Sequence, residues 1–142
     1  MRIATLKLTD LDSGNCVYIT VLANPGRVAC SVIPEGSGDI EVALELDDCK
    51  QIVALLEQAN KSDADYIQAP DKGRLPLAHR FKNLDGGEEA TLFISRKDNS
   101  LGITVERSDE GEVGFCISVE DAKNLVDALT SALMLASASI SK

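Results

Sequence analysis

The sequence predicts an α+β fold in which one ββββα unit occurs twice. Shifting the chain by 73 residues aligns positions 1–60 with 74–133 without a gap and gives ten identities, among them Gly14/Gly87 and Asp48/Asp121. The apolar positions of the two copies also coincide. In each copy the apolar period changes from two residues to 3.6 at the same place, as expected where strands give way to a helix. We therefore expect two four-stranded antiparallel sheets, each covered by one C-terminal helix, packed as an intramolecular pseudo-dimer.

In the first copy, alternation of apolar and polar residues predicts strands over residues 2–9, 16–23, 27–33 and 39–46. The segments between them, DLDSGN, NPG and PEGSG, are rich in the residues that form turns. A helix is predicted to follow. Asp47 and Asp48 stand at its start, where carboxylates can cap free N–H groups and favour the positive end of the helix dipole. Its apolar stripe consists of Cys49, Ile52, Val53, Leu56 and Ala59.

The second copy repeats this order. It predicts strands over residues 77–83, 89–96, 101–107 and 112–119 and a helix over 120–136. The stripe of that helix consists of Ala122, Leu125, Val126, Leu129, Leu133 and Ala136.

These elements predict the domain organisation. Residues 1–60 form the first repeat, 61–76 a linker with two prolines and one glycine, 77–136 the second repeat, and 137–142 a frayed tail. Because a unit of about 60 residues buries too little surface to be secure alone, we expect the two repeats to share one compact domain.

The charge and the apolar pattern narrow the function classes. A formal net charge of −9 disfavours duplex DNA and anionic membranes as partners, since both attract Lys and Arg. No apolar run approaches the roughly 18 to 20 residues that cross a bilayer, and the N-terminal residues alternate where a signal peptide would be continuously apolar. We expect a cytoplasmic protein without a membrane partner.

The residues that carry catalysis or bind metal show no recognisable arrangement. Cys16, Cys30, Cys49 and Cys116 lack CxxC spacing, and His79 has no nearby Cys or His to complete a zinc site. The chain contains no GxSxG, P-loop, HExxH or GxGxxG motif. We therefore expect no enzyme activity, no metal and no cofactor.

The sheet faces turned away from the helices offer candidate binding residues. Alternation places Tyr18 in the first copy and Phe93 in the second on these faces, with Lys7, Arg80 and Lys82 among small polar neighbours. Aromatic rings with basic neighbours suit the stacking of unpaired bases. In the alternative interpretation, both rings pack against the other repeat or across a homodimer interface.

The tandem ββββα units, each with a glycine turn between its first two strands (DSGN at 12–15, DGGE at 85–88) and a helix with an Ala/Leu face, resemble the PUR-repeat and Whirly class of single-stranded nucleic-acid-binding proteins. The resemblance implies curved sheets that bind single-stranded DNA or RNA through exposed aromatic and basic residues. The matching positions are Lys7, Tyr18, Arg80, Lys82 and Phe93.

Two functional hypotheses follow. The first is a non-catalytic acidic interaction module that binds a protein partner, as an adaptor or inhibitor, or that self-associates. It rests on the net charge of −9 and on the missing catalytic motifs. The alternative is a single-stranded DNA- or RNA-binding protein that uses the exposed sheet faces.

Overall fold

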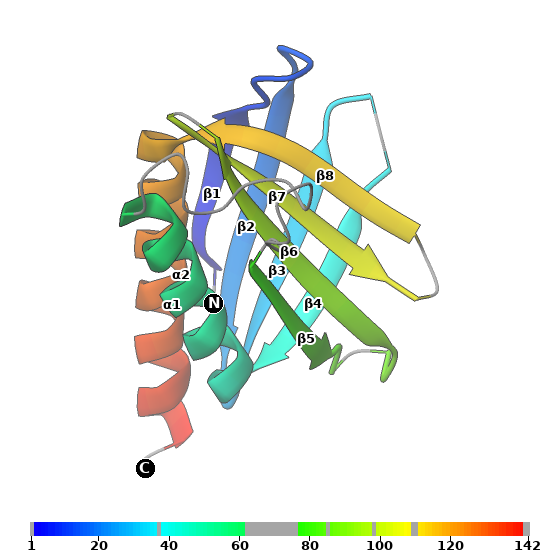
Figure 1. Cartoon of the computed structure of the whole chain (residues 1–142). Helices are drawn as coiled ribbons and strands as arrows, with labels where there is room; N and C mark the ends of the chain where they lie inside the picture. The colour runs from blue at the N-terminus through cyan, green and yellow to red at the C-terminus, as the bar shows by residue number, and fades with distance from the viewer. Residues whose placement is uncertain are drawn as a thin grey trace.

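The computed structural model describes residues 2–36, 38–61, 77–84, 86–97, 99–108 and 111–140, so most of the predicted linker lies outside the described residues. The first repeat comprises β1 (Arg2–Thr9), β2 (Cys16–Asn24), β3 (Arg27–Pro34), β4 (Ile40–Glu45) and α1 (Leu46–Lys61). The second comprises β5 (Leu77–Lys82), β6 (Glu89–Lys97), β7 (Ser100–Arg107), β8 (Gly111–Ser118) and α2 (Val119–Ile140). Figure 1 labels these elements.

The predicted duplication of a ββββα unit is confirmed. Each repeat forms one antiparallel meander, with strand order β1-β2-β3-β4 in the first sheet and β5-β6-β7-β8 in the second. Every strand begins and ends within one residue of its prediction. Helix α2 continues to Ile140, past the predicted end at residue 136, where a frayed tail was expected. The added residues contain no glycine or proline that would end a helix, and Ala136 is fully buried.

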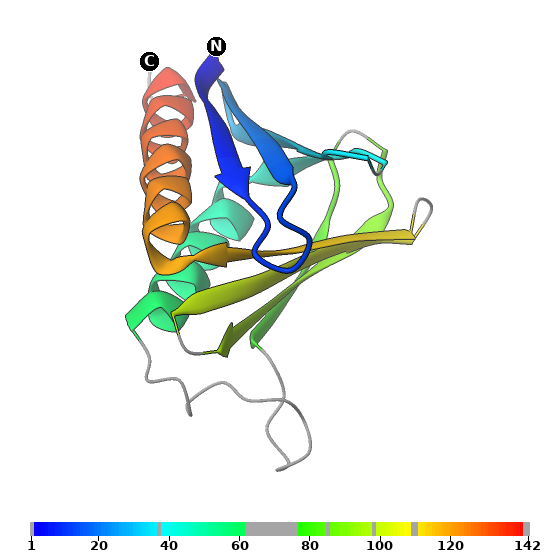
Figure 2. The same cartoon turned by 90° about the horizontal axis from the view of Figure 1, so that it is seen from above.

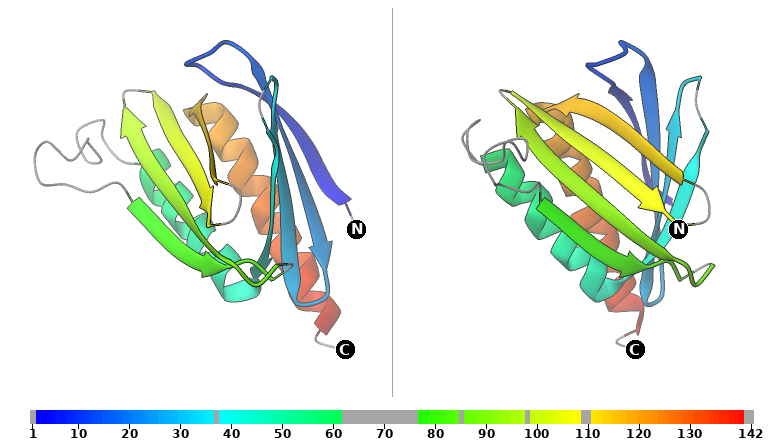
Figure 3. Two further views of the ribbon diagram at one scale, coloured as in Figure 1. Left: turned by 90° about the vertical axis from the view of Figure 1, so that its right-hand side faces the viewer. Right: turned by 45° about the vertical axis from the view of Figure 1, so that its right-hand side comes forward.

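The two helices are exchanged between the repeats. Helix α2 of the second repeat mainly contacts β1, β2 and β3 of the first sheet, and it also contacts β7 and β8 of its own. Helix α1 contacts β5 and β6 of the second sheet and β3 and β4 of its own. The helices lie side by side and run in opposite directions (Figure 1, Figure 3). The pseudo-dimer is therefore intertwined. The first sheet is covered mainly by α2 of the second repeat, and α1 of the first repeat contributes to covering the second sheet.

One hydrophobic core lies between the sheets and the helix pair, which form three sides around it when the molecule is seen from above (Figure 2). Val21 and Ile94, which are 73 positions apart, occupy equivalent places on the inner faces and are both 0% exposed. A cavity of about 60 Å³ remains at the centre, lined only by apolar side chains from both repeats, including Leu56 and Leu129.

At one residue of each outer edge strand, Ala43 on β4 and Cys116 on β8, a turn from the other repeat bonds to the backbone. At the β4 edge, Asn83 Oδ1 accepts a hydrogen bond from Ala43 N (2.8 Å), and Leu84 N donates to Ala43 O (2.9 Å). Cys116 on β8 is bonded in the same way: Asp10 Oδ1 accepts from Cys116 N (2.9 Å), and the next backbone amide, of Leu11, donates to Cys116 O (2.7 Å). These contacts repeat at a spacing of 73 residues and tie the two repeats together.

Glycines shape both of these turns. Gly14 and Gly87 have φ values of +80° and +77°. Residues with a Cβ rarely adopt this backbone conformation. Each donates its N–H to the carbonyl of the edge-closing residue, Asp10 or Asn83, at 2.7 Å. The repeated glycine is thus explained by the turn that each repeat inserts against its neighbour.

Candidate functional site

The outer face of the first sheet carries an exposed apolar and basic row. Lys7 lies opposite Tyr18, and Tyr18 lies opposite Ile33, so the three side chains follow one another across β1, β2 and β3. Lys7 is exposed, Tyr18 is half-buried, and Ile33 is 39% exposed, the only strand residue among the exposed large hydrophobic side chains of the described residues. We call these residues the Lys7–Tyr18–Ile33 row. Sequence reasoning found Lys7 and Tyr18 but missed Ile33.

The equivalent row of the second sheet is polar. Arg80, Thr91 and Glu106 stand 73 positions after the three residues of the first row and lie opposite one another across β5, β6 and β7, followed by Glu112 on β8. Arg80 Nε lies 3.7 Å from Glu89 Oε2, with both side chains largely exposed. Such an exposed pair contributes at most about 1 kcal/mol to stability, but it offsets the positive charge of this face.

Phe93 occupies the neighbouring row of the second sheet. It lies opposite Ala78 on β5 and Thr104 on β7, and Thr104 lies opposite Gly114 on β8. Lys82 lies opposite Glu89, at the far end of β5. The structure therefore divides the five predicted residues between two sheets: Lys7 and Tyr18 on the first, and Arg80, Lys82 and Phe93 on the second.

Each outer face also contains a hollow at an equivalent place. The hollow in the second sheet, about 400 Å³, is lined by Ser95, Gly102, Thr104, Gly114 and Cys116, together with Asp12 and Ser100. The one in the first sheet is about 240 Å³ and is lined by the equivalents Leu22, Ala29, Ser31, Glu41 and Ala43, among others. Two glycines in the second sheet replace an alanine and a glutamate in the first, and the second hollow is the larger.

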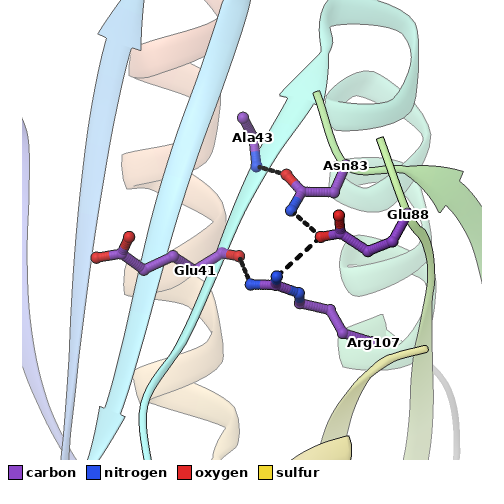
Figure 4. A network of polar contacts seen from close by, with 5 residues as sticks. All are labelled: Glu41, Ala43, Asn83, Glu88 and Arg107. Atoms are coloured by element: carbon purple, nitrogen blue, oxygen red, sulfur yellow. Dashed lines mark hydrogen bonds and ion pairs between the residues drawn. The ribbon is translucent and has the colours of Figure 1, made fainter. Parts of the chain in front are cut away.

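A polar network joins the two sheets, and its charged pair, Arg107 and Glu88, comes from the second repeat. Arg107 Nη2 lies 2.9 Å from Glu88 Oε1, and Arg107 Nη1 donates to the carbonyl of Glu41 at 2.8 Å. Asn83, which is 1% exposed, donates from Nδ2 to Glu88 while its Oδ1 holds Ala43 N (Figure 4). Sequence comparison of the repeats gave no signal for this network, because Pro34 and Asn15 stand at the positions equivalent to Arg107 and Glu88.

His79 has a partner that the sequence did not indicate. Its Nε2 lies 2.8 Å from Asp48 Oδ1, with side-chain exposures of 14% and 19%. Asp48 belongs to the first turn of α1, and His79 belongs to β5, so the pair joins the exchanged helix to the sheet it covers. Asp48, one of the two acids at the start of α1, therefore has a structural role in holding the helix against β5.

The cysteines are free thiols. Burial raises the pKa of Cys49 to about 11, and burial together with the nearby Cys49 raises the pKa of Cys30 to about 12. Both thiols are therefore protonated near neutral pH, which is unfavourable for a nucleophile or a metal ligand. Within the described residues, no three His, Cys, Asp or Glu side chains gather as a metal site.

Among the described residues, no helix has the length and hydropathy that a membrane crossing requires. A scan against protein-family models and a search of curated proteins found no match to this chain.

Proposed function

We propose that this protein is a non-catalytic interaction module that binds a protein partner through the Lys7–Tyr18–Ile33 row. The observation that carries the proposal is the exposure of Ile33 directly beside Tyr18 on an outer sheet face. Tyrosine is enriched among the residues that dominate binding energy at interfaces, and a long basic side chain adds both apolar stem and charge.

The surroundings of the row indicate the chemistry of the partner. Thr5, Thr20 and Ser31 form the adjacent polar row, which Glu41 on β4 continues, and Glu45 is exposed further along the same strand. A partner surface with an apolar centre and a basic rim complements this arrangement. The net charge of −9 increases the rate at which such a basic surface associates. The four free thiols support a cytoplasmic location, where thiols stay reduced.

The two repeats provide a matched test. The double variant Tyr18→Thr/Ile33→Glu gives the first sheet the side chains that the second carries at Thr91 and Glu106. The control Thr91→Ala/Glu106→Ala alters the same number of residues on the second sheet. Affinity capture from extracts of the source organism at low and moderate salt, read by mass spectrometry, is expected to return a partner with wild type and control and to lose it with the double variant. Equal capture by the double variant contradicts the proposal.

A specific observation supports a second candidate, single-stranded nucleic-acid binding by the second sheet. Phe93 is half-buried on the outer face, opposite Thr104, which lines the hollow of about 400 Å³. Arg80 lies on the neighbouring row and Lys82 on the same strand. One stacked base contributes about 1 to 3 kcal/mol, enough for weak binding when few phosphates are neutralised.

Fluorescence anisotropy with labelled oligonucleotides tests this candidate. Single strands must bind more tightly than duplex, and Phe93→Ala or Arg80→Ala must weaken binding. With about three phosphates neutralised, a fourfold rise in salt lowers the affinity on the order of 20-fold. Equal binding of duplex, or unchanged binding by both variants, eliminates it.

A further inference from the structure

The outer edge strands of the two sheets border a groove. Residues 38–40, at the start of β4, and 112–114, in β8, line it together with Pro34, and its volume is about 280 Å³. Residues 39–40 and 112–113 stand at equivalent positions in the two repeats, so the groove lies between corresponding parts of the fold. Asp39 and Glu112, which are equivalent residues, are both exposed and give both sides of the groove a carboxylate.

The backbone of β8 has unused hydrogen-bonding groups beside this groove. The N–H and C=O of Cys116 bond to Asp10 and Leu11 and therefore point away from β7. In an antiparallel pair, residues two apart direct these groups to the same side. The N–H and C=O of Gly114 and Glu112 thus also point away from β7, and no described residue bonds to them.

The corresponding edge of β4 is closed by a side chain. Glu41, the equivalent of Gly114, has its carbonyl bonded to Arg107 Nη1 at 2.8 Å. In the first repeat the position of Arg107 is taken by Pro34, whose side chain has no donor. Because proline stands where the other repeat has arginine, the β8 edge stays open where the β4 edge is blocked.

We propose that residues 112–114 of β8 bind an extended basic segment of a partner protein as an added strand. Main-chain hydrogen bonds to an exposed edge supply affinity in such complexes, and alternate side chains supply specificity. Asp39 and Glu112 attract Lys or Arg side chains of the added segment. The open stretch, about 10 Å long, accommodates two or three residues before the turn at Cys116 ends it. This inference rests on the protein-binding function proposed above and names the class of partner.

The probe is a fluorescein-labelled peptide of sequence Lys-Val-Lys-Val-Lys, titrated by anisotropy against the full chain. We expect it to bind about tenfold or more tightly than Glu-Val-Glu-Val-Glu, and N-methylation of its alternate amides to weaken binding by about tenfold. Hydrogen exchange measured by NMR should show new protection at the amides of Gly114 and Glu112. Binding that is insensitive to N-methylation, or protection that appears elsewhere, overturns the proposal.

Two variants and one control sharpen the test. Pro34→Arg places in the first repeat the side chain that closes the other edge and should abolish peptide binding, and Glu112→Lys should weaken it about tenfold. Glu57→Lys, an equal charge change on the exposed side of α1, should have little effect. If Glu112→Lys and Glu57→Lys weaken peptide binding equally, the attraction is non-specific and the proposal is wrong. It is also wrong if the same amides become protected without peptide as the protein concentration rises, because a homodimer then occupies the edge. If the peptide does not bind to β8 but the partner is still captured through the Lys7–Tyr18–Ile33 row, only the strand-addition proposal fails. The proposed function fails separately, when the Tyr18→Thr/Ile33→Glu variant captures the partner as well as wild type does.

Discussion

At the scale of single residues, Asp10 and Asn83 show how one structural task is performed by two chemistries. Both accept a hydrogen bond from the backbone of the opposite repeat, at Cys116 and Ala43 respectively. Partial burial raises the pKa of Asp10, but the hydrogen bonds donated by Cys116, by Ser13 and by the amide of Asp12 outweigh it and hold the pKa below its usual value. Asn83 instead uses its amide to donate to Glu88.

The lowered pKa of Asp10 predicts a pH-dependent contribution to stability. Because the folded pKa lies below the unfolded value of about 3.9, this contribution is present above pH 4 and is lost as the pH falls through the folded pKa. Asp10→Asn should lower the free energy of unfolding by about 1 kcal/mol at pH 7, and the difference from wild type should shrink below pH 4. Urea unfolding at several pH values measures this. The exposed control Asp39→Asn should change little, and a gap for Asp10→Asn that stays constant with pH would contradict the assignment.

The reverse exchange, Asn83→Asp, should be far more damaging. Asn83 is 1% exposed and its Nδ2 donates to Glu88, whose charge Arg107 already pairs, so a carboxylate there would lose this bond and face a second carboxylate. An uncompensated buried charge costs about 3 to 5 kcal/mol. Since burial and repulsion raise the folded pKa of the new carboxyl, the loss should grow as the pH rises above the unfolded value. Chemical denaturation at pH 5 and pH 8 tests this, and equal stability at both pH values would count against it.

At the scale of elements, periodicity predicted the strands and both helix stripes, because burial on one face imposes a period of two or 3.6 residues whatever the partner. The same alternation correctly placed Tyr18 on an outer face. It did not predict the exchange of helices, since an apolar stripe specifies burial but not which sheet buries it. Nor did it find Ile33 beside Tyr18 or Arg107 beside Glu88, because those neighbours depend on strand register and on contacts between repeats.

The helix stripes themselves can be tested with Leu56 and Leu129. These equivalent residues are 2% and 4% exposed and line the central cavity. Truncating either to alanine should lower the free energy of unfolding by about 2 to 5 kcal/mol, since each deletion enlarges an existing void. Thermal melting measures the loss, with the exposed Glu57→Ala as control, expected within about 0.5 kcal/mol of wild type. An unchanged melting temperature for either leucine variant would show that the stripe is not the main contact.

At the scale of the whole molecule, the duplication has kept its interior and changed its exterior. The inner faces and the turn contacts at Cys116 and Ala43 repeat at a spacing of 73 residues. The outer rows differ: Tyr18 and Ile33 in the first sheet correspond to Thr91 and Glu106 in the second. Folding requires both repeats to match at their shared core, whereas binding requires only one face to be complementary to a partner. This difference explains why the proposed interaction surfaces are asymmetric in a symmetric fold.

The exchanged helices predict that neither repeat folds alone but that the two assemble. A fragment of residues 1–61 lacks α2, which covers β1, β2 and β3, and a fragment of 77–142 lacks α1, which covers β5 and β6. Each fragment would expose an apolar sheet face and, at about 60 residues, would bury too little surface to offset its conformational entropy. Mixed together, they should form a 1:1 complex with the secondary structure of the intact chain, as measured by circular dichroism and light scattering. The control is the first fragment carrying Leu56→Ala. It should assemble more weakly with the second fragment, because the Leu56 side chain reaches the shared core. If either fragment alone is monomeric and melts cooperatively, the exchange of helices is not what holds the repeats together.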